Sequence, residues 1–257
     1  MIHSTAIVSS EAAFGDGVEV GPYAIIGAGV TIGVGSKVGA FSRIEGPTVI
    51  GERNVFYGQV SIGGPPQDLK YRGERTELHI GNDNMFREFV TINRGTAGGG
   101  GITTVESGNF FMAYSHVAHD CHVGSHTIFA NNATLAGHVE IGDHATIGAF
   151  TAIHQFCRVG DHAFIGGYTV VTQDALPFIK TVGERPAKTY GINTIGLQRK
   201  GFSPETIDAL DRAYRILIRS KLKLHDALLK IETDLGFFAE TRYLVDFARH
   251  SQRGFIR

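Results

Sequence analysis

An apolar residue occupies every sixth position of this chain, in one register, over residues 2–62. The register resumes over residues 80–92, and the pattern then continues one place later over residues 105–171. A short fixed period is typical of repeat architectures, and a six-residue period is typical of a parallel β-helix. The sequence therefore predicts an all-β solenoid in which three consecutive hexads make one triangular coil.

A small or short residue stands two places before most of the apolar anchors, as Ala24 does before Ile26. Side chains two apart on a strand share a face, so both positions point into the coil. Cys121 and Cys157 occupy this small position and are separated by two coils. At roughly 4.8 Å per strand layer they lie about 10 Å apart, which is beyond disulfide reach. We therefore expect two buried free thiols that pack as small hydrophobes.

Two segments, residues 63–79 and 93–104, break the hexad pattern. The first carries Pro65-Pro66 and many charged residues, and the second contains a run of four glycines. Neither composition can fill a coil core, so both segments are expected to project as surface loops. We interpret the first loop as covering part of the solenoid surface, since an otherwise regular solenoid has little other reason to extrude it.

The hexads end after Val171, and the apolar period becomes helical from Ser203 onward. Ser203 followed by Pro204 is a helix start, with a capping hydroxyl and a proline at the first helical position. Two further helices are expected at about 222–234 and 238–250. We therefore divide the chain into a β-helix over residues 1–191 and an α-helical domain over residues 192–257, which would cover the open end of the coil.

The formal net charge is −1, so no bulk positive field favours nucleic acid as a partner. No apolar run approaches the length of a transmembrane helix, and no signal-peptide pattern opens the chain. The cytoplasm is the compartment that we expect.

Eight of the 12 histidines lie between residues 116 and 162. His126, His144 and His162 follow one another at intervals of one coil in equivalent turns, which predicts a ladder on one corner of the coil. Because they repeat with the coil, we interpret them as solvated turn residues. A stack of metal ligands is the alternative.

His119, His138 and His154 form a second column, but they do not occupy one repeat position. Counting one coil and then two coils onward from His119 reaches Gly137 and Gln155, each of which has a histidine beside it. We predict that these three imidazoles stack on one edge of three successive coils. Repetition of the fold does not explain such a convergence, so it favours a functional site.

The chemistry of this column favours general-base catalysis. Imidazole is the usual base near neutral pH, and a carboxylate such as that of Asp120 can fix its tautomer. Gly137, level with His119 one coil further on, can offer an unobstructed backbone N–H to a developing oxyanion. No serine or outward-pointing cysteine stands in the column, which favours direct attack by a substrate hydroxyl over a covalent intermediate.

A zinc site is the competing interpretation, because His116, His119 and His122 are spaced by three. A hexapeptide-repeat carbonic anhydrase binds metal through histidines at a subunit interface. Zinc needs three ligands that converge with an open fourth position, and alternation along the strands points these three side chains in differing directions. We therefore expect no metal and no cofactor, with a zinc hydratase kept as a rival.

Several motifs resemble one family closely, the acyl-[acyl-carrier-protein]–UDP-N-acetylglucosamine O-acyltransferases that begin lipid A biosynthesis. The matching stretches are QDLKY at 67–71, REFVTINRGT at 87–96, HVAHDC at 116–121, NNATLAGH at 131–138, HQF at 154–156 and GLQRKGF at 196–202. They follow in order along most of the chain. A generic hexapeptide-repeat transferase would share the period and lack these motifs.

The resemblance implies a left-handed coil, a homotrimer and active sites in clefts between subunits. His119 matches the general base, Asp120 the residue that orients it, and Gly137 the oxyanion donor. The donor substrate would be acyl carrier protein with a (R)-3-hydroxyacyl thioester, and the acceptor the glucosamine 3-hydroxyl of UDP-N-acetylglucosamine. Substrate-contacting positions of the family match Gln67, Asp68, Lys70, His116, His138, His154, Gln155, Asn193, Arg199 and Lys200.

Gly167 matches the family position that limits acyl-chain length, where glycine leaves room for a longer chain. In coil register it lies a hexad away from His119, on another face. The two can share a cleft only if a neighbouring subunit supplies one of them, which agrees with a trimer.

The tail departs from the family pattern. Gln198 and Lys200 stand where the family commonly has basic residues including a second arginine, and Ile195 stands where some members carry an acid. Lysine lacks the bidentate fork of arginine, so contacts with a diphosphate would differ there.

Other functions remain open. The sister N-acyltransferase of the same pathway carries an additional domain before its coil, whereas the hexads here begin at Ile2. A non-catalytic solenoid scaffold is a further alternative, against which the histidine column and the two projecting loops argue.

Overall fold

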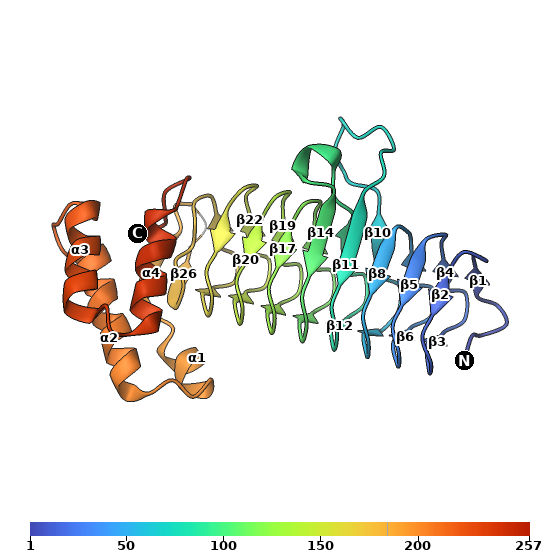
Figure 1. The fold of residues 1–257 in the computed structure, drawn as a ribbon, viewed down its shortest axis with the longest axis horizontal. Coiled ribbons are helices and arrows are strands. Elements are labelled where there is room, and N and C mark those ends of the chain that lie inside the picture. Colours follow the sequence, from blue (N-terminus) through green and yellow to red (C-terminus); the bar gives the residue numbers. More distant parts are fainter. Residues whose placement is uncertain (184) are drawn as a thin grey trace.

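The computed structural model describes residues 1–183 and 185–257. Short strands wind into a left-handed parallel β-helix, and the helices gather at its C-terminal end (Figure 1). The predicted fold class, a hexapeptide-repeat β-helix followed by helices, is confirmed. Two loops project from one side of the coil between β10 and β14 (Figure 1).

The strands form three sheets, one for each face of the coil. The nine-stranded sheet contains β1 (Ile7–Val8), β4 (Ile25–Ile26), β7 (Arg43–Ile44), β10 (Ser61–Gly64), β13 (Thr91–Asn93), β16 (His116–Val117), β19 (Thr134–Leu135), β22 (Ala152–Ile153) and β25 (Val170–Val171). The eight-stranded sheet contains β2 (Ala13–Phe14), β5 (Val30–Ile32), β8 (Thr48–Ile50), β11 (Glu77–Ile80), β14 (Ile102–Val105), β17 (His122–Val123), β20 (Glu140–Ile141) and β23 (Arg158–Val159). The ten-stranded sheet contains β3 (Glu19–Val20), β6 (Lys37–Val38), β9 (Val55–Phe56), β12 (Met85–Phe86), β15 (Phe110–Phe111), β18 (Ile128–Phe129), β21 (Thr146–Ile147), β24 (Phe164–Ile165), β26 (Ile179–Val182) and β27 (Lys188–Ile192).

Strand pairing explains why the hexad register survives one loop and slips after the other. In regular coils paired residues are three hexads apart, as Val117 and Leu135 are. Ile62 pairs with Ile92, so the first loop lengthens its coil by two whole hexads and leaves the register unchanged. Ile80 pairs with Val105, so the second loop lengthens its coil by one hexad and one further residue, which produces the slip.

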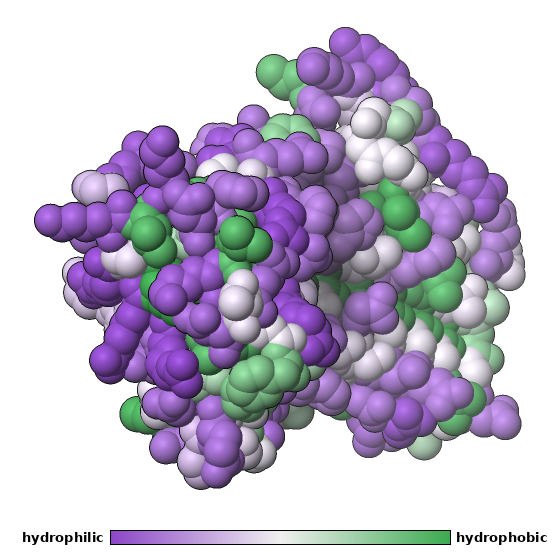
Figure 2. Space-filling model, turned by 60° about the vertical axis from the view of Figure 1, so that its left-hand side comes forward, coloured by the Kyte–Doolittle hydropathy of each residue, from purple (hydrophilic) through white to green (hydrophobic). Residues whose placement is uncertain are grey.

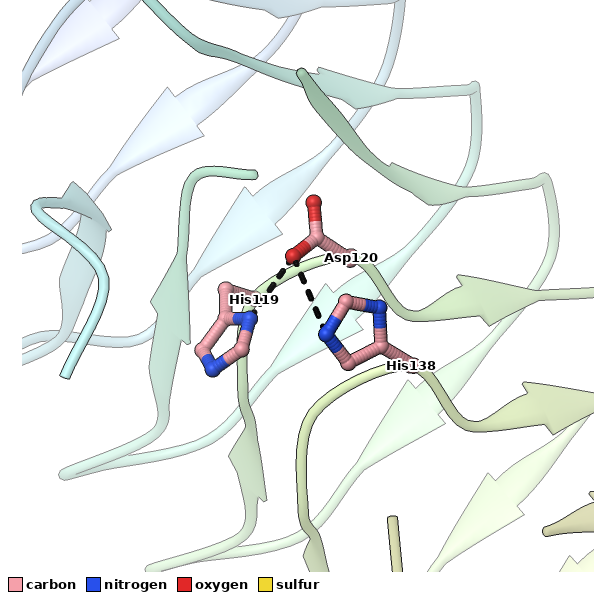
Figure 3. A group of neighbouring side chains, drawn as sticks. All are labelled: His119, Asp120 and His138. Atoms are coloured by element: carbon pink, nitrogen blue, oxygen red, sulfur yellow. Dashed lines mark hydrogen bonds and ion pairs between the residues drawn. The ribbon is translucent and has the colours of Figure 1, made fainter. Parts of the chain in front are cut away.

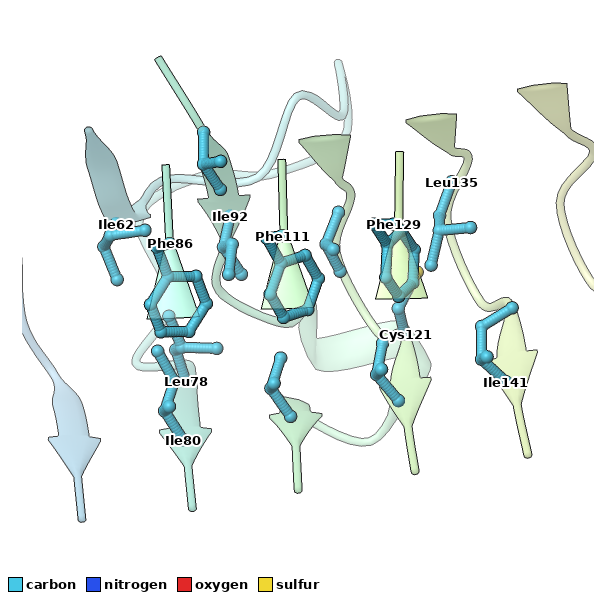
Figure 4. Packing of buried hydrophobic residues seen from close by; sticks show 14 of the residues in the cluster. Ile62, Leu78, Ile80, Phe86, Ile92, Phe111, Cys121, Phe129, Leu135 and Ile141 are labelled. Carbon is cyan, nitrogen blue, oxygen red and sulfur yellow. The ribbon is translucent and has the colours of Figure 1, made fainter. Parts of the chain in front are cut away.

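The coil core consists of the apolar anchors and the small residues beside them. Four phenylalanines stack through successive coils, with ring centroids 4.7 Å apart for Phe56 and Phe86, 5.0 Å for Phe86 and Phe111, and 4.6 Å for Phe111 and Phe129. Figure 4 shows the last three rings of this stack. Offset stacks of this kind add stability beyond the area that they bury. They hold consecutive coils in register, which keeps the turns aligned.

Both cysteines are free and buried, as predicted. Burial raises the pKa of Cys121 to about 12 and that of Cys157 to about 11. Thiols that are protonated and enclosed in this way are poor nucleophiles, so neither cysteine is available for covalent catalysis.

The turns between sheets form three corners that run along the coil, and each corner has two turn residues per coil. The first corner joins the nine-stranded to the eight-stranded sheet, the second joins the eight-stranded to the ten-stranded sheet, and the third leads back to the nine-stranded sheet. The second turn residue has a positive φ at most turns, including φ 58° at Asp120 and 62° at His138. Equivalent side chains therefore project in the same direction, one above another.

In the part of the chain that the structure describes, four α-helices and one π-helical segment follow the coil: α1 (Thr194–Arg199), α2 (Pro204–Tyr214), η2 (Arg215–Arg219), α3 (Leu224–Leu235) and α4 (Ala239–Arg249). The expected start of α2 is confirmed, since the Ser203 side chain accepts a hydrogen bond from the backbone N–H of Thr206. Both later helices lie where they were expected. The six-residue helix α1 was not predicted, and its N-cap is Asn193.

The helices bury their own apolar cluster, which includes Leu210, Leu217 and Leu244, against β26 and β27. The chain end returns to the coil, where Asp174 and Phe255 form a bridge. Hydrophilic side chains cover much of the helical domain and the projecting loops, whereas apolar side chains appear along the coil between them (Figure 2). Among the described residues, no helix is long and apolar enough to cross a membrane.

Candidate active site

Two imidazoles and one carboxylate meet at the first corner (Figure 3). Nδ1 of His119 lies 2.7 Å from Oδ2 of Asp120, and Nε2 of His138 lies 3.6 Å from the same oxygen. The rings of His119 and His138 are edge-on, with centroids 5.2 Å apart. The Asp120 side chain is 1% exposed and that of His119 is 14% exposed, so the pair is sheltered from water but reaches the surface through the imidazole.

The coil itself creates this arrangement. Strand β16 ends at Val117, and the turn that follows places His119 and Asp120 side by side, with Asp120 at φ 58°. The backbone N–H of Asp120 donates to Oγ1 of Thr103, 2.8 Å away, which fixes the turn. One coil further on, the backbone N–H of His138 donates to the carbonyl oxygen of His119. The two imidazoles are thus placed by strand pairing, before any contact between their side chains.

The hydrogen bond to Asp120 determines how His119 can act. When Nδ1–H donates to the carboxylate, Nε2 carries the lone pair and faces away from it. This is the orientation of a general base whose tautomer is fixed by an acidic partner. The roles predicted for His119 as the base and Asp120 as the residue that orients it stay predictions, with which this geometry is compatible.

Gly137 lies directly against the imidazole of His119. A Cβ atom at this position would stand 2.5 Å from Cε1 and 2.8 Å from Nε2 of His119. Its backbone N–H makes no hydrogen bond with any residue that the structure describes, and the same holds for His119 and Gln155 in equivalent turns. Of these three residues, Gly137 is the one whose missing side chain faces the imidazole of His119, so a backbone N–H without a protein partner lies in the turn next to the base.

A cavity of about 320 Å³ opens between the two projecting loops and the first corner. Asp68, Lys70 and Tyr71 line it from the first loop, residues 96–98 from the second, and His138 and Phe156 from the coil. A larger cavity of about 710 Å³ lies on the other side of Asp120 and His138 and is bounded by Arg158 and Arg253. The first loop therefore covers the smaller cavity. His138 and Phe156 line both cavities, and His119 lies behind them, bonded to Asp120 and outside both sets of lining residues.

Hydrogen bonds from Arg94 attach the first loop to the coil. The guanidinium of Arg94 donates to the carbonyl oxygen of Gly46 (3.0 Å) and to Oη of Tyr71 (3.4 Å). Oδ1 of Asp68 accepts from the backbone N–H of Lys70, whose side chain remains exposed at the cavity. Gln67, expected beside them as a substrate contact, is exposed on the same loop.

His116 and His138 have lowered pKa values. Burial is the main cause of the lower pKa at both, and the nearby imidazole of His119 adds to it. At His138 the charge of Asp120 opposes the shift, so its pKa falls in spite of that carboxylate. Nδ1 of His116 lies 2.7 Å from Oγ1 of Thr91 on the nine-stranded sheet. The lower pKa favours the neutral form of both imidazoles, in which they act as hydrogen-bonding groups.

Comparison with known proteins identifies the family. A profile described as UDP-N-acetylglucosamine O-acyltransferase, domain 2, matches residues 174–256, and one for the bacterial transferase hexapeptide matches residues 102–137 and 138–173. The chain is 48% identical to an acyl-[acyl-carrier-protein]–UDP-N-acetylglucosamine O-acyltransferase of Thermodesulfovibrio yellowstonii, over 100% of this chain and 99% of the relative. It is 49% identical to the enzyme of the same name from Syntrophobacter fumaroxidans, with the same coverage.

This chain belongs to the UDP-N-acetylglucosamine O-acyltransferase family. The solved structure of a UDP-N-acetylglucosamine acyltransferase from Bacteroides fragilis agrees with a TM-score of 0.97 at 42% identity, over 100% of both chains. The acyltransferase from Acinetobacter baumannii gives 0.96 at 42% identity, over 100% of this chain and 99% of that one. The resemblance read from the motifs is thereby confirmed, and so is the enzyme class, an acyltransferase.

The acyltransferase site differs in one respect from the predicted column of three imidazoles. The ring stacked on His138 is that of Phe156, with centroids 4.5 Å apart, and not that of His154. Phe156 shares the second turn position with Asp120 and His138 and has a φ of 64°, whereas His154 precedes the turn. His154 is exposed, and its Nδ1 lies 3.1 Å from the carbonyl oxygen of Gln155 and 3.5 Å from Arg253.

The ladder at the second corner is not solvated as predicted. His126 stacks on His144 and His144 on His162, with centroids 5.0 and 4.7 Å apart, but only His126 is exposed. Phe202 packs edge-on against His162, and burial lowers the pKa of His162 to about 4. The helical domain thus covers this end of the ladder, which the coil period alone does not reveal.

Three residues that were expected to contact the nucleotide lie at this second corner. The eight-stranded sheet separates this corner from the first corner, where His119 lies. Asn193 caps α1 and donates from its side-chain amide to the carbonyl oxygen of His162, 3.1 Å away. Arg199 ends α1, and Lys200 follows it, both exposed. Gly167 lies at the third corner beside Tyr168, also exposed. Within one chain, the described structure brings none of these residues to the two cavities at the first corner.

The set His116, His119 and His122 does not converge. Nδ1 of His122 lies 2.9 Å from Thr104 on the eight-stranded sheet, while His116 contacts the nine-stranded sheet. A different set, His119, Asp120 and His138, has ligand atoms within 4.8 Å of one another. The carboxylate of that set already accepts three hydrogen bonds, from Thr96 and His119, so a metal ion would have to displace them.

Thr96 is the neighbour of the pair that the sequence did not single out. Its backbone N–H and its hydroxyl both donate to the carboxylate of Asp120. In the sequence Thr96 is marked only as the last residue of the motif REFVTINRGT at 87–96, and no spacing connects it with Asp120.

Proposed function

We propose that this chain transfers a (R)-3-hydroxyacyl group from acyl carrier protein to the 3-hydroxyl of UDP-N-acetylglucosamine, the first step of lipid A biosynthesis. Relatives that carry this name match over its whole length. The observation that carries the mechanism is the His119–Asp120 pair, 2.7 Å apart, with Nε2 directed away from the carboxylate. His138 of the same cluster lines the cavity under the first loop. No cofactor takes part in the proposed chemistry.

In this mechanism Nε2 of His119 removes the proton of the sugar hydroxyl as its oxygen attacks the thioester carbonyl carbon. The backbone N–H of Gly137 donates to the oxyanion that forms beside it. Collapse of the tetrahedral intermediate breaks the C–S bond, and the imidazolium returns its proton to the departing thiolate. An ester bond has then replaced the thioester, with Asp120 stabilising the imidazolium between the two steps.

The remaining predicted residues are assigned to binding. We assign Asp68, Lys70 and the neighbouring Gln67 to binding of the sugar, which is supported by the cavity that Asp68 and Lys70 line together with His138. We assign His116, His154 and Gln155 to the edge of the same site. Asn193, Arg199 and Lys200 are assigned to the nucleotide diphosphate, for which a guanidinium is the better ligand.

We further propose a homotrimer as the active unit. Residues assigned to one reaction lie on all three corners of a single chain, so a complete site requires the corners of neighbouring copies. The third corner also exposes stacked aromatic pairs along the coil, Tyr23 with Phe41, Phe89 with Tyr114 and Phe150 with Tyr168. Exposed apolar rows of this kind favour a protein interface.

The cytoplasm is the compartment that we propose, because nucleotide sugars and acyl carrier proteins are cytoplasmic substrates. The test of the function is mass spectrometry of the product formed from UDP-N-acetylglucosamine and a panel of acyl-carrier-protein thioesters. We expect an ester at the 3-position. An amide, formed only when the acceptor is a UDP-3-O-acylglucosamine, would identify the sister N-acyltransferase. Carbon dioxide hydration with no acyl transfer would identify the hydratase.

Gly167→Met should shift the enzyme toward shorter acyl chains without abolishing activity. With glycine at this position we expect a preference for a donor of about 14 carbons, since each buried CH₂ contributes roughly 0.8 kcal/mol and four contribute about 3 kcal/mol. Gly167 has no positive φ, and a Cβ there would stand 3.2 Å from the carbonyl oxygen of Ala149, a tight contact that a shift of a few tenths of an ångström relieves. Competition among donors of about 10, 12 and 14 carbons measures the preference.

Tyr168 is the control for this experiment. It is exposed beside Gly167 and could close the acyl groove from another direction. Tyr168→Ala should leave the wild-type preference in place if Gly167 limits the length. A preference that is unchanged in Gly167→Met and altered in Tyr168→Ala would assign the limit to Tyr168.

A further inference from the structure

The carboxylate of Asp120 is held by a residue from outside the coil. Thr96 lies in the second projecting loop, and its backbone N–H donates to Oδ1 of Asp120 at 2.7 Å. Its hydroxyl donates to Oδ2 at 2.6 Å, the same oxygen that faces Nδ1 of His119 at 2.7 Å. Both residues are buried, Thr96 with 7% and Asp120 with 2% of its surface exposed. Both bonds are therefore protected from competition by water.

The loop is built to keep Thr96 in this position. Thr96 caps the 3₁₀ helix η1 (Ala97–Gly99), and its Oγ1 also accepts from the backbone N–H of Gly99 at 3.1 Å. The carbonyl oxygen of Thr96 accepts from the N–H of Gly101 at 2.8 Å. One hydroxyl thus donates to the carboxylate and accepts from the loop, which fixes the direction of its hydrogen.

The contact between loop and carboxylate is close. A Cβ atom at Gly99 would stand 2.1 Å from Cγ of Asp120, so only glycine lets the loop backbone pass over the carboxylate. Oδ1 and Oδ2 each receive one bond from Thr96, and this pair of bonds fixes rotation of the carboxylate about its Cβ–Cγ bond. The direction in which Oδ2 faces His119 therefore depends on Thr96.

We propose that Thr96 is a positioning residue for the acyl transfer, acting through Asp120 on the orientation of His119. The inference rests on the proposed function, since it assumes that His119 is the base. Without the hydroxyl, the carboxylate can rotate and Oδ2 can leave Nδ1. A displaced base lowers kcat. Although Thr96 lines the smaller cavity, its hydroxyl donates to Asp120, so KM should change much less than kcat.

The first test compares Thr96→Val, which removes the hydroxyl at nearly constant shape, with Thr96→Ser, which keeps it. We expect kcat to fall about 10- to 100-fold in the valine variant and to stay within about threefold in the serine variant. KM for both substrates should change by less than about twofold. Thr96→Ala serves as a second variant if valine disturbs η1, and the melting temperature of each variant reports its folding. Equal activity of the valine and serine variants overturns the proposal.

The second test is a double-mutant cycle with Asp120→Ala. If Thr96 acts only through the carboxylate, Thr96→Val has no further effect on kcat once that carboxylate is gone. The same fold-loss in both backgrounds would mean an independent structural role and would overturn the inference. The two proposals fail separately. A wild-type enzyme that makes no acylated sugar contradicts the function, whereas an active wild type with an inactive His119→Ala and a fully active Thr96→Val contradicts only this inference.

Discussion

His119→Ala is expected to lower kcat by at least about 100-fold while the protein stays folded. The imidazole is the group that can take the hydroxyl proton, because Nδ1 is engaged by Asp120 and Nε2 is directed away from it. The side chain lies at the corner of the coil and outside the apolar core, so its loss leaves that core intact. Steady-state kinetics with UDP-N-acetylglucosamine and an acyl-carrier-protein thioester, together with a melting curve, measure both effects.

The matched control is His225→Ala, which removes an exposed imidazole on α3, far along the chain from the corner turns. It should keep activity within about twofold of the wild type. Free imidazole added to His119→Ala should restore part of the lost rate if the missing group is a base. Retention of more than about a tenth of the wild-type activity in His119→Ala would place the base on another residue.

The coil could be predicted in detail because its period is local. Each apolar anchor, recurring every six residues, marks one strand followed by one turn. The number of residues that each loop adds to its coil follows from the same register. The start of α2 was equally local, since Ser203 and Pro204 define it without any tertiary contact. The pairing of His119 with Asp120 needed only the sequence HD in a turn.

The errors concern features that depend on direction or on distant packing. The coil period placed His154 near the column, but the positive φ of the second turn residue decides which side chain stacks on His138, and that residue is Phe156. The histidines of the second corner were interpreted as solvated because the turn pattern contains no information on Phe202, which comes from the helical domain, well beyond His162 in the sequence. The helix α1 has six residues, too few for a helical period to be recognised.

Thr96 shows a third limit. It is separated from Asp120 by 24 residues and lies in a segment whose glycines identify it only as a loop. No spacing rule connects a loop residue with a coil turn, so the contact requires the structure. The capping geometry of Thr96 and the missing side chain of Gly99 are explained only by the carboxylate of Asp120, against which both residues lie.

Gly137→Ala is expected to lower kcat by about 100-fold although it adds a single methyl group. The new Cβ would stand 2.5 Å from Cε1 of His119, whereas carbon atoms in contact prefer about 3.5–4.0 Å. The ring must therefore move by about 1 Å, and it cannot do so while Nδ1 stays bonded to Asp120. The backbone of Gly137 has no positive φ, so alanine is compatible with the turn and the coil should remain folded. Kinetics and a melting curve measure the result.

Two variants separate the possible causes of that loss. Gly27→Ala is the control for adding a methyl group to the coil, because its Cβ would meet the nearest atom, the carbonyl oxygen of Ile44, at 3.4 Å, an ordinary contact. It should be as active and nearly as stable as the wild type. The double variant His119→Ala with Gly137→Ala then decides the mechanism. If the methyl group acts by displacing the base, it costs no further activity once the imidazole is absent. An additional loss in that background would mean that the methyl group obstructs the oxyanion or the substrate, so that Gly137 acts independently of His119.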